Sequence, residues 1–257
     1  MSNHSFVISA EQGALALVGE TLELTGAEAH HAVAVKRVSS GEELDLLDGT
    51  GLRLRVKVLD ASKELLRVIV LERLQEVPPA HRIGLVQALA KGDRDLQAVE
   101  SAVELGVFTV RPWQADRSIV RWSGSKTEKA MAKWRSLVRS AQKQSRRAFE
   151  PEVLEPVNTK TLSTQIRHLC ESGELVLILH EAAQLSVAQE TQNWLSQASK
   201  QAGVTLVVGP EGGISHAELE QFVAAGARPA LLGQHVLRAS TAGPAALVLV
   251  RHLLGEL

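Results

Sequence analysis

The sequence predicts an α/β protein, with a small β-barrel domain followed by a larger domain built on a parallel sheet. Two observations lead to this fold class. Residues 6–74 contain short apolar or alternating runs separated by turn residues, which is typical of a compact all-β domain. From residue 82 onward, apolar strand-like runs alternate with stretches of helical periodicity, which is typical of a parallel sheet covered by helices.

In the β-rich part, one short helix is expected to begin near Thr25 and to include residues 29–38. The sequence Glu-Val-Pro-Pro-Ala at 76–80 reads as a linker, because two consecutive prolines cannot continue a strand ladder. We therefore predict one domain at 1–75 and a second at 76–257. The strands expected in the first domain are 14–17, 21–24, 44–47, 52–59 and 65–71.

In the second domain, Asp93 is placed to cap a helix that ends at Gly106, and Ser215 and Glu218 have the spacing of a capping box. Thr241 is placed to cap a final helix at 245–254. Residues 151–156 are expected to form a turn region. The other helices are expected within 126–147, 162–170 and 187–198, and the strands at 83–89, 107–110, 176–179, 206–208 and 230–232.

Composition excludes several classes of protein. The net charge of −1 means that the chain as a whole is not a polyanion binder, so any surface for a polyanion must be local. The single Cys170 cannot form an intrachain disulfide, which fits a reducing, cytoplasmic setting and argues against a Cys/His zinc site. The first ten residues lack the apolar core of a signal peptide, and no apolar run is long enough to cross a bilayer, so we expect no membrane partner. Because there is a single cysteine, we also expect no metal.

Two glycine loops, each following an apolar run, dominate the C-terminal part of the chain. The first is Gly209-Pro210-Glu211-Gly212-Gly213, and the second begins at Gly233. Such loops expose backbone N–H groups and admit a ligand closely, because glycine has no Cβ. Neither loop has the phosphate-loop or the dinucleotide pattern. Considered alone, they fit either a ligand-binding edge or two structural turns.

The combination of motifs is more specific. Val-Gly-Pro-Glu-Gly-Gly, followed by Leu-Gly-x-x-x-Leu-Arg, resembles the SPOUT superfamily of S-adenosylmethionine-dependent RNA methyltransferases. More narrowly, it resembles the RsmE family, which methylates N3 of a uridine in 16S ribosomal RNA. The resemblance extends over nearly the whole chain through AEAHHAVAVKR at 27–37, QALAKGDR at 87–94, VELG at 103–106 and QKQSR at 142–146.

The resemblance implies a PUA-like, RNA-binding β-barrel at 1–75 and a SPOUT methyltransferase domain with a C-terminal deep trefoil knot at 76–257. It also implies a homodimer that acts on 16S rRNA in the small ribosomal subunit. General folding rules disfavour knots, so periodicity alone could not have suggested one.

The cofactor implied is S-adenosylmethionine, in a pocket where the strand ends at His180, Gly209 and Gly233 meet. Ligands of parallel α/β sheets bind beyond the carboxyl ends of the strands, which places this pocket at the same edge. A metal at His180-Glu181 lacks a third ligand at suitable spacing. The candidate cofactor-binding residues are Leu179, His180, Gly209, Pro210, Glu211, Gly212, Gly213, Leu232, Gly233, Val236 and Leu237.

Arg238 is the candidate catalytic residue. A uridine becomes anionic as it loses its N3 proton, so a fixed cation near its carbonyl oxygens lowers the barrier. The alternative role of Arg238 is a structural salt bridge to a carboxylate such as Glu211. No general base stands out in the sequence.

The strongly basic stretch at 126–147 holds eight Lys or Arg residues and one acid, Glu128. Arg135, Arg139 and Lys143 recur four residues apart on one helix face, where like charges repel, so a polyanion that neutralises them is favoured over a merely solvated face. Trp134 belongs to the buried face. The candidate RNA-binding residues are Lys36, Arg37, Lys91, Arg94, Arg117, Arg135, Arg139, Lys143 and Arg146.

Three functions remain open from the sequence. The first is rRNA uridine-N3 methylation. The second is a SPOUT enzyme that acts on another RNA or on a ribose 2′-oxygen. The third is a non-catalytic RNA-binding or ribosome-assembly protein, which would not bind the cofactor and would not need intact glycine loops.

Overall fold

The computed structural model describes residues 3–62, 64–199 and 201–257. The chain forms two compact units. The first unit contains Met1–Pro78 and Gln142–Glu150, and the second contains Pro79–Ala141 and Pro151–Leu257. The first division thus falls inside the expected linker. The assignment of Gln142–Glu150 to the first unit differs from the predicted division into 1–75 and 76–257. As boundaries of functional domains, 1–75 and 76–257 stay a prediction.

The first unit is built on a five-stranded sheet in the order β1-β3-β4-β5-β2. Within the described residues, no pairing joins the two end strands β1 and β2, so the expected barrel is a sheet that is not closed into a cylinder. Buried and exposed side chains alternate along much of β4 because one face packs on the core. The strands are β1 (His4–Val7), β2 (Thr21–Thr25), β3 (Glu43–Leu47), β4 (Leu52–Ala61) and β5 (Leu65–Gln75).

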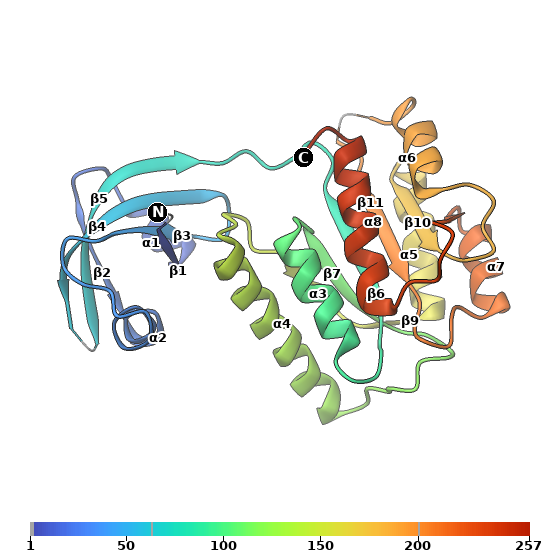
Figure 1. Cartoon of the computed structure of the whole chain (residues 1–257), viewed down its shortest axis with the longest axis horizontal. Helices are drawn as coiled ribbons and strands as arrows, with labels where there is room; N and C mark the ends of the chain where they lie inside the picture. The colour runs from blue at the N-terminus through green and yellow to red at the C-terminus, as the bar shows by residue number, and fades with distance from the viewer. Residues whose placement is uncertain (1–2, 63, 200) are drawn as a thin grey trace. The chain divides into compact units, whose positions relative to one another are not determined.

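Three helical segments accompany this sheet (Figure 1). The helix expected near Thr25 is present as α2 (Gly26–His30), which continues as the π-helical turn η1 (His31–Val35). The strand expected at 14–17 is wrong, because Ala14 and Leu15 belong to α1 (Ala10–Leu15) and the next two residues lie in no strand. Ser9 and Gln12 form a capping box that starts α1. The prediction assigned this apolar run to a strand, whereas its first two residues follow the helical period of α1.

The segment Gln142–Glu150 joins the first unit through backbone pairing. Gly51 N–H donates to the Ala148 carbonyl at 3.0 Å, and Glu150 N–H donates to the Gly49 carbonyl at 2.9 Å. Gly51 has φ +111°, and a Cβ there would lie 2.7 Å from Cζ of Phe149. The β3–β4 turn and the returning chain therefore fit closely only because glycine occupies this position.

The second unit contains a parallel seven-stranded sheet in the order β12-β10-β11-β6-β7-β8, with β9 also paired to β7. Its central strands are nearly continuous apolar runs, as expected when helices cover both faces. The strands are β6 (Ile83–Ala88), β7 (Thr109–Gln114), β8 (Glu152–Val153), β9 (Val157–Asn158), β10 (Leu175–Leu179), β11 (Val204–Val208) and β12 (Arg228–Ala230).

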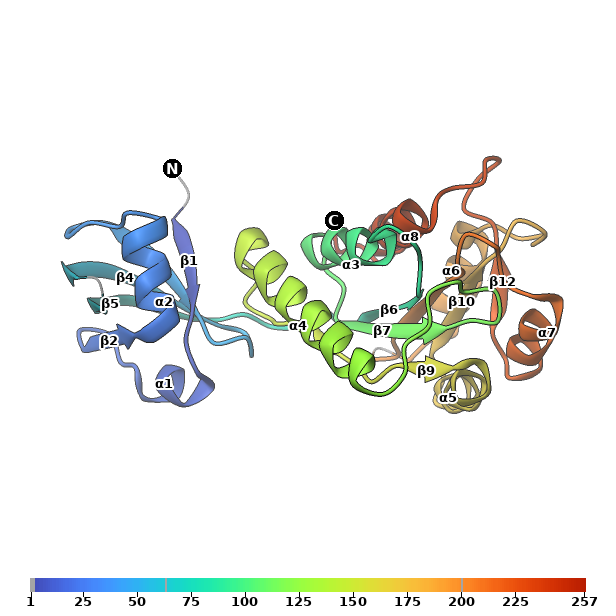
Figure 2. The ribbon, with the colours of Figure 1, turned by 90° about the horizontal axis from the view of Figure 1, so that it is seen from below.

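Helices cover both faces of this sheet, with α3 and α8 on one face and α5 and α7 on the other (Figure 2). Trp134 of α4 is buried in the core on the α3 and α8 side, as predicted, and Trp194 of α6 is buried in the same core. Phe222 of α7 lies in the core on the opposite side. The helices are α3 (Arg94–Glu104), α4 (Ser125–Ser145), α5 (Thr159–Glu171), α6 (Val187–Leu195), α7 (His216–Ala224) and α8 (Ala239–Leu253).

Two expected helix caps differ in the structure. Asp93 is the N-cap residue of α3, as expected, but it has a left-handed backbone with φ 57° and its side chain makes no capping hydrogen bond. Its carboxylate instead accepts from Lys133 Nζ at 3.0 Å. Thr241 lies inside the first turn of α8, which begins at Ala239. The turn region expected at 151–156 contains the short strand β8. The capping box of Ser215 and Glu218 is confirmed.

Candidate functional site

Three parallel strands end side by side in the second unit. β10 lies between β11 and β12 and pairs with both, so the residues that follow these strands emerge at one edge of the sheet. His180 N–H donates to the Ala230 carbonyl at 3.1 Å, which fixes the end of β10 beside the end of β12. The sheet order thus places the strand ends before His180, Gly209 and the second glycine loop at the same edge.

The first glycine loop is a tight turn between β11 and α7. Gly213 N–H donates to the Pro210 carbonyl at 2.9 Å, and Gly213 has φ +72°. A Cβ on Gly209 would lie 2.7 Å from Cγ1 of Ile214, and one on Gly212 would lie 3.2 Å from Cβ of Arg117. The packing of the loop itself therefore favours glycine at 209, and the positive φ favours glycine at 213, whatever ligand the loop faces. At Gly212 a Cβ would require only a small shift of Arg117.

Glu211 ties this loop to the loop that follows β6. Its Oε1 accepts from the Lys91 backbone N–H at 3.0 Å and from Arg94 Nη1 at 3.4 Å. Since β6 and β11 are neighbouring parallel strands, these contacts join two adjacent strand ends. The guanidinium of Arg94, a candidate RNA-binding residue, thus helps to hold the glycine loop. The Lys91 side chain makes no hydrogen bond or ion pair within the described residues.

A second brace reaches the loop from the end of β7. Arg117 Nη1 donates to the Gly212 carbonyl at 3.0 Å. The preceding residue, Asp116, donates its backbone N–H to Glu218 Oε1 at 2.7 Å. Glu218 is fully buried, and its carboxylate also accepts from Thr159 Oγ1 at 2.7 Å and from Ser215 N–H at 2.9 Å. One buried carboxylate thus joins the starts of α5 and α7 to the loop after β7.

The second glycine loop is exposed from Gly233 to Arg238. Gly233 does not have a positive φ, and a Cβ built on it would meet no heavy atom within 4 Å among the described residues. Val236 is 78% exposed and Leu237 is 39% exposed, whereas Leu232 is half-buried. The loop therefore offers both open space beside a glycine backbone and apolar side chains that this chain does not cover.

Arg238 is exposed and is the N-cap residue of α8, where its carbonyl accepts from Thr241 N–H at 2.8 Å. Its guanidinium makes no hydrogen bond or ion pair within the described part of the chain. The alternative salt bridge to Glu211 is absent there, because Glu211 pairs with Arg94. At the end of β10, His180 accepts from Ala182 N–H through Nδ1 at 3.2 Å, which fixes its ring next to the strand end.

The basic helix face is partly neutralised by the protein itself. Arg135 forms an ion pair with Glu155 at 2.8 Å, and Lys143 forms one with Glu28 at 2.8 Å. The argument that this row of charges needs a polyanion is therefore weaker than the sequence indicated. Arg139 is exposed and makes no ion pair among the described residues, so it remains the charge on this face that is free to bind a phosphate.

The first unit contains four candidate RNA-binding residues from two distant stretches, Lys36 and Arg37 after η1, and Lys143 and Arg146 in the returning segment. Lys143 Nζ also lies 3.5 Å from Nδ1 of His31, which precedes Lys36 on η1. Burial lowers the pKa of His31, and the positive charge of Lys143 lowers this pKa further. The charges of Lys36 and Lys143 thus both act on His31 in the first unit, although Lys143 is itself paired with Glu28.

Sequence reasoning missed the residues that hold the site together. Glu218 was found only as a helix cap, although it also binds Asp116 and Thr159. Asp116 was not singled out at all. No local pattern could have found these contacts, because the partners lie far apart along the chain. In the described residues, no three or more His, Cys, Asp or Glu side chains gather as a metal site. Nor does any described helix have the length and hydropathy to span a membrane.

Comparisons with known proteins agree with this architecture. The family model of the RNA methyltransferase domain matches residues 77–251, and that of the RNA methyltransferase PUA domain matches residues 24–71. Ribosomal RNA small subunit methyltransferase E from Mycobacterium bovis is 40% identical over 230 residues, which cover 89% of this chain and 85% of that protein. The Bacillus subtilis protein of the same name is 26% identical over 225 residues, which cover 86% of each.

A solved structure extends the similarity to the fold. The crystal structure of a ribosomal RNA small subunit methyltransferase E from Neisseria gonorrhoeae, bound to S-adenosyl methionine, matches with a TM-score of 0.81. The identity is 27%, and the match covers 98% of both chains. With the parallel α/β unit, its braced glycine loops and the PUA unit, these matches show that the chain belongs to the RNA methyltransferase family and, within it, to the ribosomal RNA small subunit methyltransferase E, or RsmE, family.

Proposed function

We propose that the protein transfers a methyl group from S-adenosylmethionine to N3 of a uridine in 16S ribosomal RNA. The observation that carries this proposal is the meeting of three parallel strand ends around two glycine loops, in a chain of the RsmE family. The S-adenosyl methionine bound to the Neisseria gonorrhoeae relative supports the choice of cofactor.

The residues at the strand ends fit this cofactor. The space beside Gly233 would be filled by any side chain there, so the glycine admits a flat ligand against the backbone. We assign the adenosine to the backbone of Leu232, Gly233 and Leu237. The other cofactor-binding positions proposed are Leu179, His180, Gly209, Pro210, Glu211, Gly212, Gly213 and Val236.

When bound, the sulfonium cofactor supplies a reactive methyl group, so the protein has to position the uridine and stabilise its charge. Arg238 is the proposed catalytic cation, because its guanidinium has no partner in the described chain and follows the second loop directly. A cation held near the uridine carbonyl oxygens favours the N3 anion that accepts the methyl group. The uridine must leave any base pair before N3 can be reached.

The proposed RNA surface uses Lys36, Arg37, Lys143 and Arg146 of the first unit and Lys91, Arg117 and Arg139 of the second. Arg94 and Arg135, which have carboxylate partners, are proposed to contact RNA only in competition with these partners. We place the protein with its ribosomal substrate in the cytoplasm.

We also propose the deep trefoil knot of the superfamily. The chain passes from β11 beyond β10 to β12, and α8 then returns so that Gly243 lies against Leu85 and Val208. This order is compatible with a final segment threaded through a loop.

The assay combines labelled S-adenosylmethionine with small ribosomal subunits that lack the modification, followed by nucleoside analysis. Label in 3-methyluridine is expected. Replacement Arg238→Ala is expected to lower kcat by about 100-fold while cofactor binding persists. The control Arg167→Ala, at an exposed position on α5, is expected to keep full activity. Label in a 2′-O-methylated nucleoside would keep the enzyme class and reject the uridine-N3 assignment. Failure to bind the cofactor would favour a non-catalytic RNA-binding protein.

A homodimer is proposed because the second loop leaves Val236 and Leu237 exposed beside the cofactor site. Light scattering is expected to give twice the chain mass, and Val236→Glu is expected to shift the protein toward monomer, since a charge would be buried at the interface. A monomeric wild-type protein would contradict this part of the proposal.

A further inference from the structure

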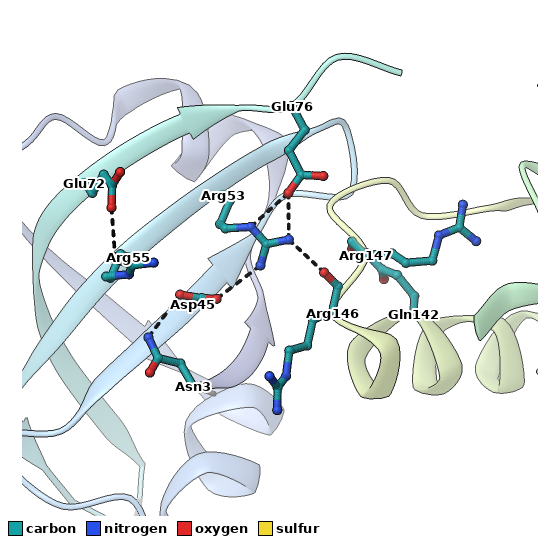
Figure 3. Close-up of polar contacts among 9 residues, drawn as sticks. All are labelled: Asn3, Asp45, Arg53, Arg55, Glu72, Glu76, Gln142, Arg146 and Arg147. Carbon is teal, nitrogen blue, oxygen red and sulfur yellow. Dashed lines mark hydrogen bonds and ion pairs between the residues drawn. The ribbon is translucent and has the colours of Figure 1, made fainter. Parts of the chain in front are cut away.

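Arg53 of β4 is the centre of a polar cluster in the first unit (Figure 3). Its guanidinium binds Asp45 of β3 through Nη1 at 3.1 Å, and Glu76 through Nε at 2.9 Å and Nη2 at 2.7 Å. Nη2 also donates to the carbonyl of Arg146 at 2.9 Å. The side chain of Arg53 is only 20% exposed, so its bonds are directed to the protein.

The three partners of Arg53 come from three different parts of the chain. Asp45 belongs to the sheet, Glu76 lies just before the first unit ends at Pro78, and Arg146 lies in the segment by which the chain returns to this unit. One planar guanidinium therefore fixes both connections to the sheet. A lysine ammonium cannot reproduce such a fork of donors, because it is a point charge on a flexible stem.

Arg146 has an unusual backbone. Its φ is 56°, in the left-handed region that side chains other than glycine rarely adopt. In the described residues, only Arg37 and Asp93 share this feature among non-glycine residues. At the C-terminus of α4, Arg146 N–H donates to the Lys143 carbonyl at 3.2 Å and Arg147 N–H donates to the Gln142 carbonyl at 3.1 Å, a pattern that ends helices on a left-handed residue. The hydrogen bond from Arg53 to the Arg146 carbonyl adds a tertiary contact that holds this conformation.

The side chain of Arg146 does not account for this strain. Its guanidinium makes no hydrogen bond or ion pair within the described parts of the chain, and it points away from the Arg53 cluster (Figure 3). Strained backbone is retained where the surrounding structure enforces it, often at binding sites. Fold stability alone would favour glycine at this position.

We propose that Arg53 is a positioning residue for the RNA substrate, which holds Arg146 in its left-handed conformation and thereby directs the Arg146 guanidinium toward an RNA phosphate. Arg146 makes the contact, and Arg53 acts through it. The inference rests on the proposed function and adds to it a residue that is largely buried and does not itself touch RNA.

The test is a double-mutant cycle on methyl transfer to small ribosomal subunits, with KM and kcat measured for the wild type, Arg53→Lys, Arg146→Gly and the double variant. Arg53→Lys keeps the charge and loses the fork, and Arg146→Gly relieves the strain and removes the guanidinium. Each is expected to raise KM for the subunits by about tenfold, the effect of losing one charged contact, with little change in kcat. The double variant is expected to be no worse than either single variant.

Arg55→Lys is the matched control, since Arg55 also lies in β4 but forms an exposed ion pair with Glu72 at 3.2 Å. It is expected to leave KM unchanged, and Arg146→Gly is expected to melt at the wild-type temperature or above. The inference is overturned if Arg146→Gly leaves KM unchanged, if the two effects multiply, or if Arg55→Lys raises KM equally. Binding of S-adenosylmethionine by each variant is measured separately, so that inactivity of the wild type rejects the proposed function and not this inference.

Discussion

Single glycines in the two loops have different physical roles. At Gly209 a Cβ would collide with Ile214 at 2.7 Å, whereas at Gly233 it would enter open space. Packing of the loop thus favours glycine at the first position. At the second position the packing of the protein does not require glycine, which leaves a ligand as the reason for it. A motif match alone treats the two positions as equivalent.

We therefore expect Gly233→Val to abolish S-adenosylmethionine binding without lowering the melting temperature, because the side chain occupies ligand space. Gly209→Ala is expected to overpack the loop, which lowers the free energy of unfolding by about 1–3 kcal/mol. The melting temperature falls accordingly. Calorimetric titration with the cofactor and thermal melts measure both. Unchanged cofactor affinity in Gly233→Val would place the pocket elsewhere.

His31 gives the first unit a pH dependence. Its pKa lies below the ordinary value of 6.5, first because of burial and then because of Lys143, while Glu28 opposes the shift and Lys36 and His4 add to it weakly. Below pH 6.5 the unfolded chain therefore binds a proton that the folded chain still excludes, so stability falls as the pH falls through this window.

The replacement His31→Gln is expected to flatten this slope. Urea midpoints are measured for both proteins between about pH 5 and 8. The variant should lose less stability on acidification, so the midpoints of the two proteins should approach each other at acid pH. Parallel curves for wild type and variant would show that His31 does not carry the effect.

Among the elements, α7 is held at its start by one side chain, Glu218. Glu218 closes the capping box with Ser215 and also receives hydrogen bonds from Asp116 and Thr159, so the start of this helix is joined to the loop after β7. That loop carries Arg117, which holds the Gly212 carbonyl. Loss of Glu218 should thus lower the stability of the protein and also loosen the first glycine loop.

Glu218→Ala is expected to destabilise the protein by about 2–4 kcal/mol, because several buried donors lose their acceptor. It should also weaken cofactor binding. The matched control is Glu220→Ala on the same helix, where the exposed carboxylate pairs with His216 at 3.2 Å. This control should stay within about 0.5 kcal/mol of wild type in chemical denaturation. Equal losses in the two variants would argue against the brace.

At the scale of the whole molecule, the two units have separate cores. Leu54 lies in the core of the first unit, and Leu206 lies in a core of the second. Truncation of a fully buried leucine leaves a cavity that costs about 2–5 kcal/mol. We expect Leu54→Ala to destabilise the first unit while the affinity for S-adenosylmethionine persists, and Leu206→Ala to impair cofactor binding on warming. Cofactor titrations at increasing temperature distinguish the two variants, and equal loss of binding would indicate one cooperative unit.

The sequence by itself determined the fold class, the alternation of strands and helices after residue 82, the burial of Trp134 and the motifs of the family. These features depend on local periodicity and on glycines within short stretches. Only the tertiary structure decided that α1 replaces a strand, that Gln142–Glu150 belongs to the first unit, and that Glu211 pairs with Arg94 rather than with Arg238. Arg53 and Glu218 bind residues from distant parts of the chain, and no local pattern encodes such partners, because they become neighbours only when the sheets form.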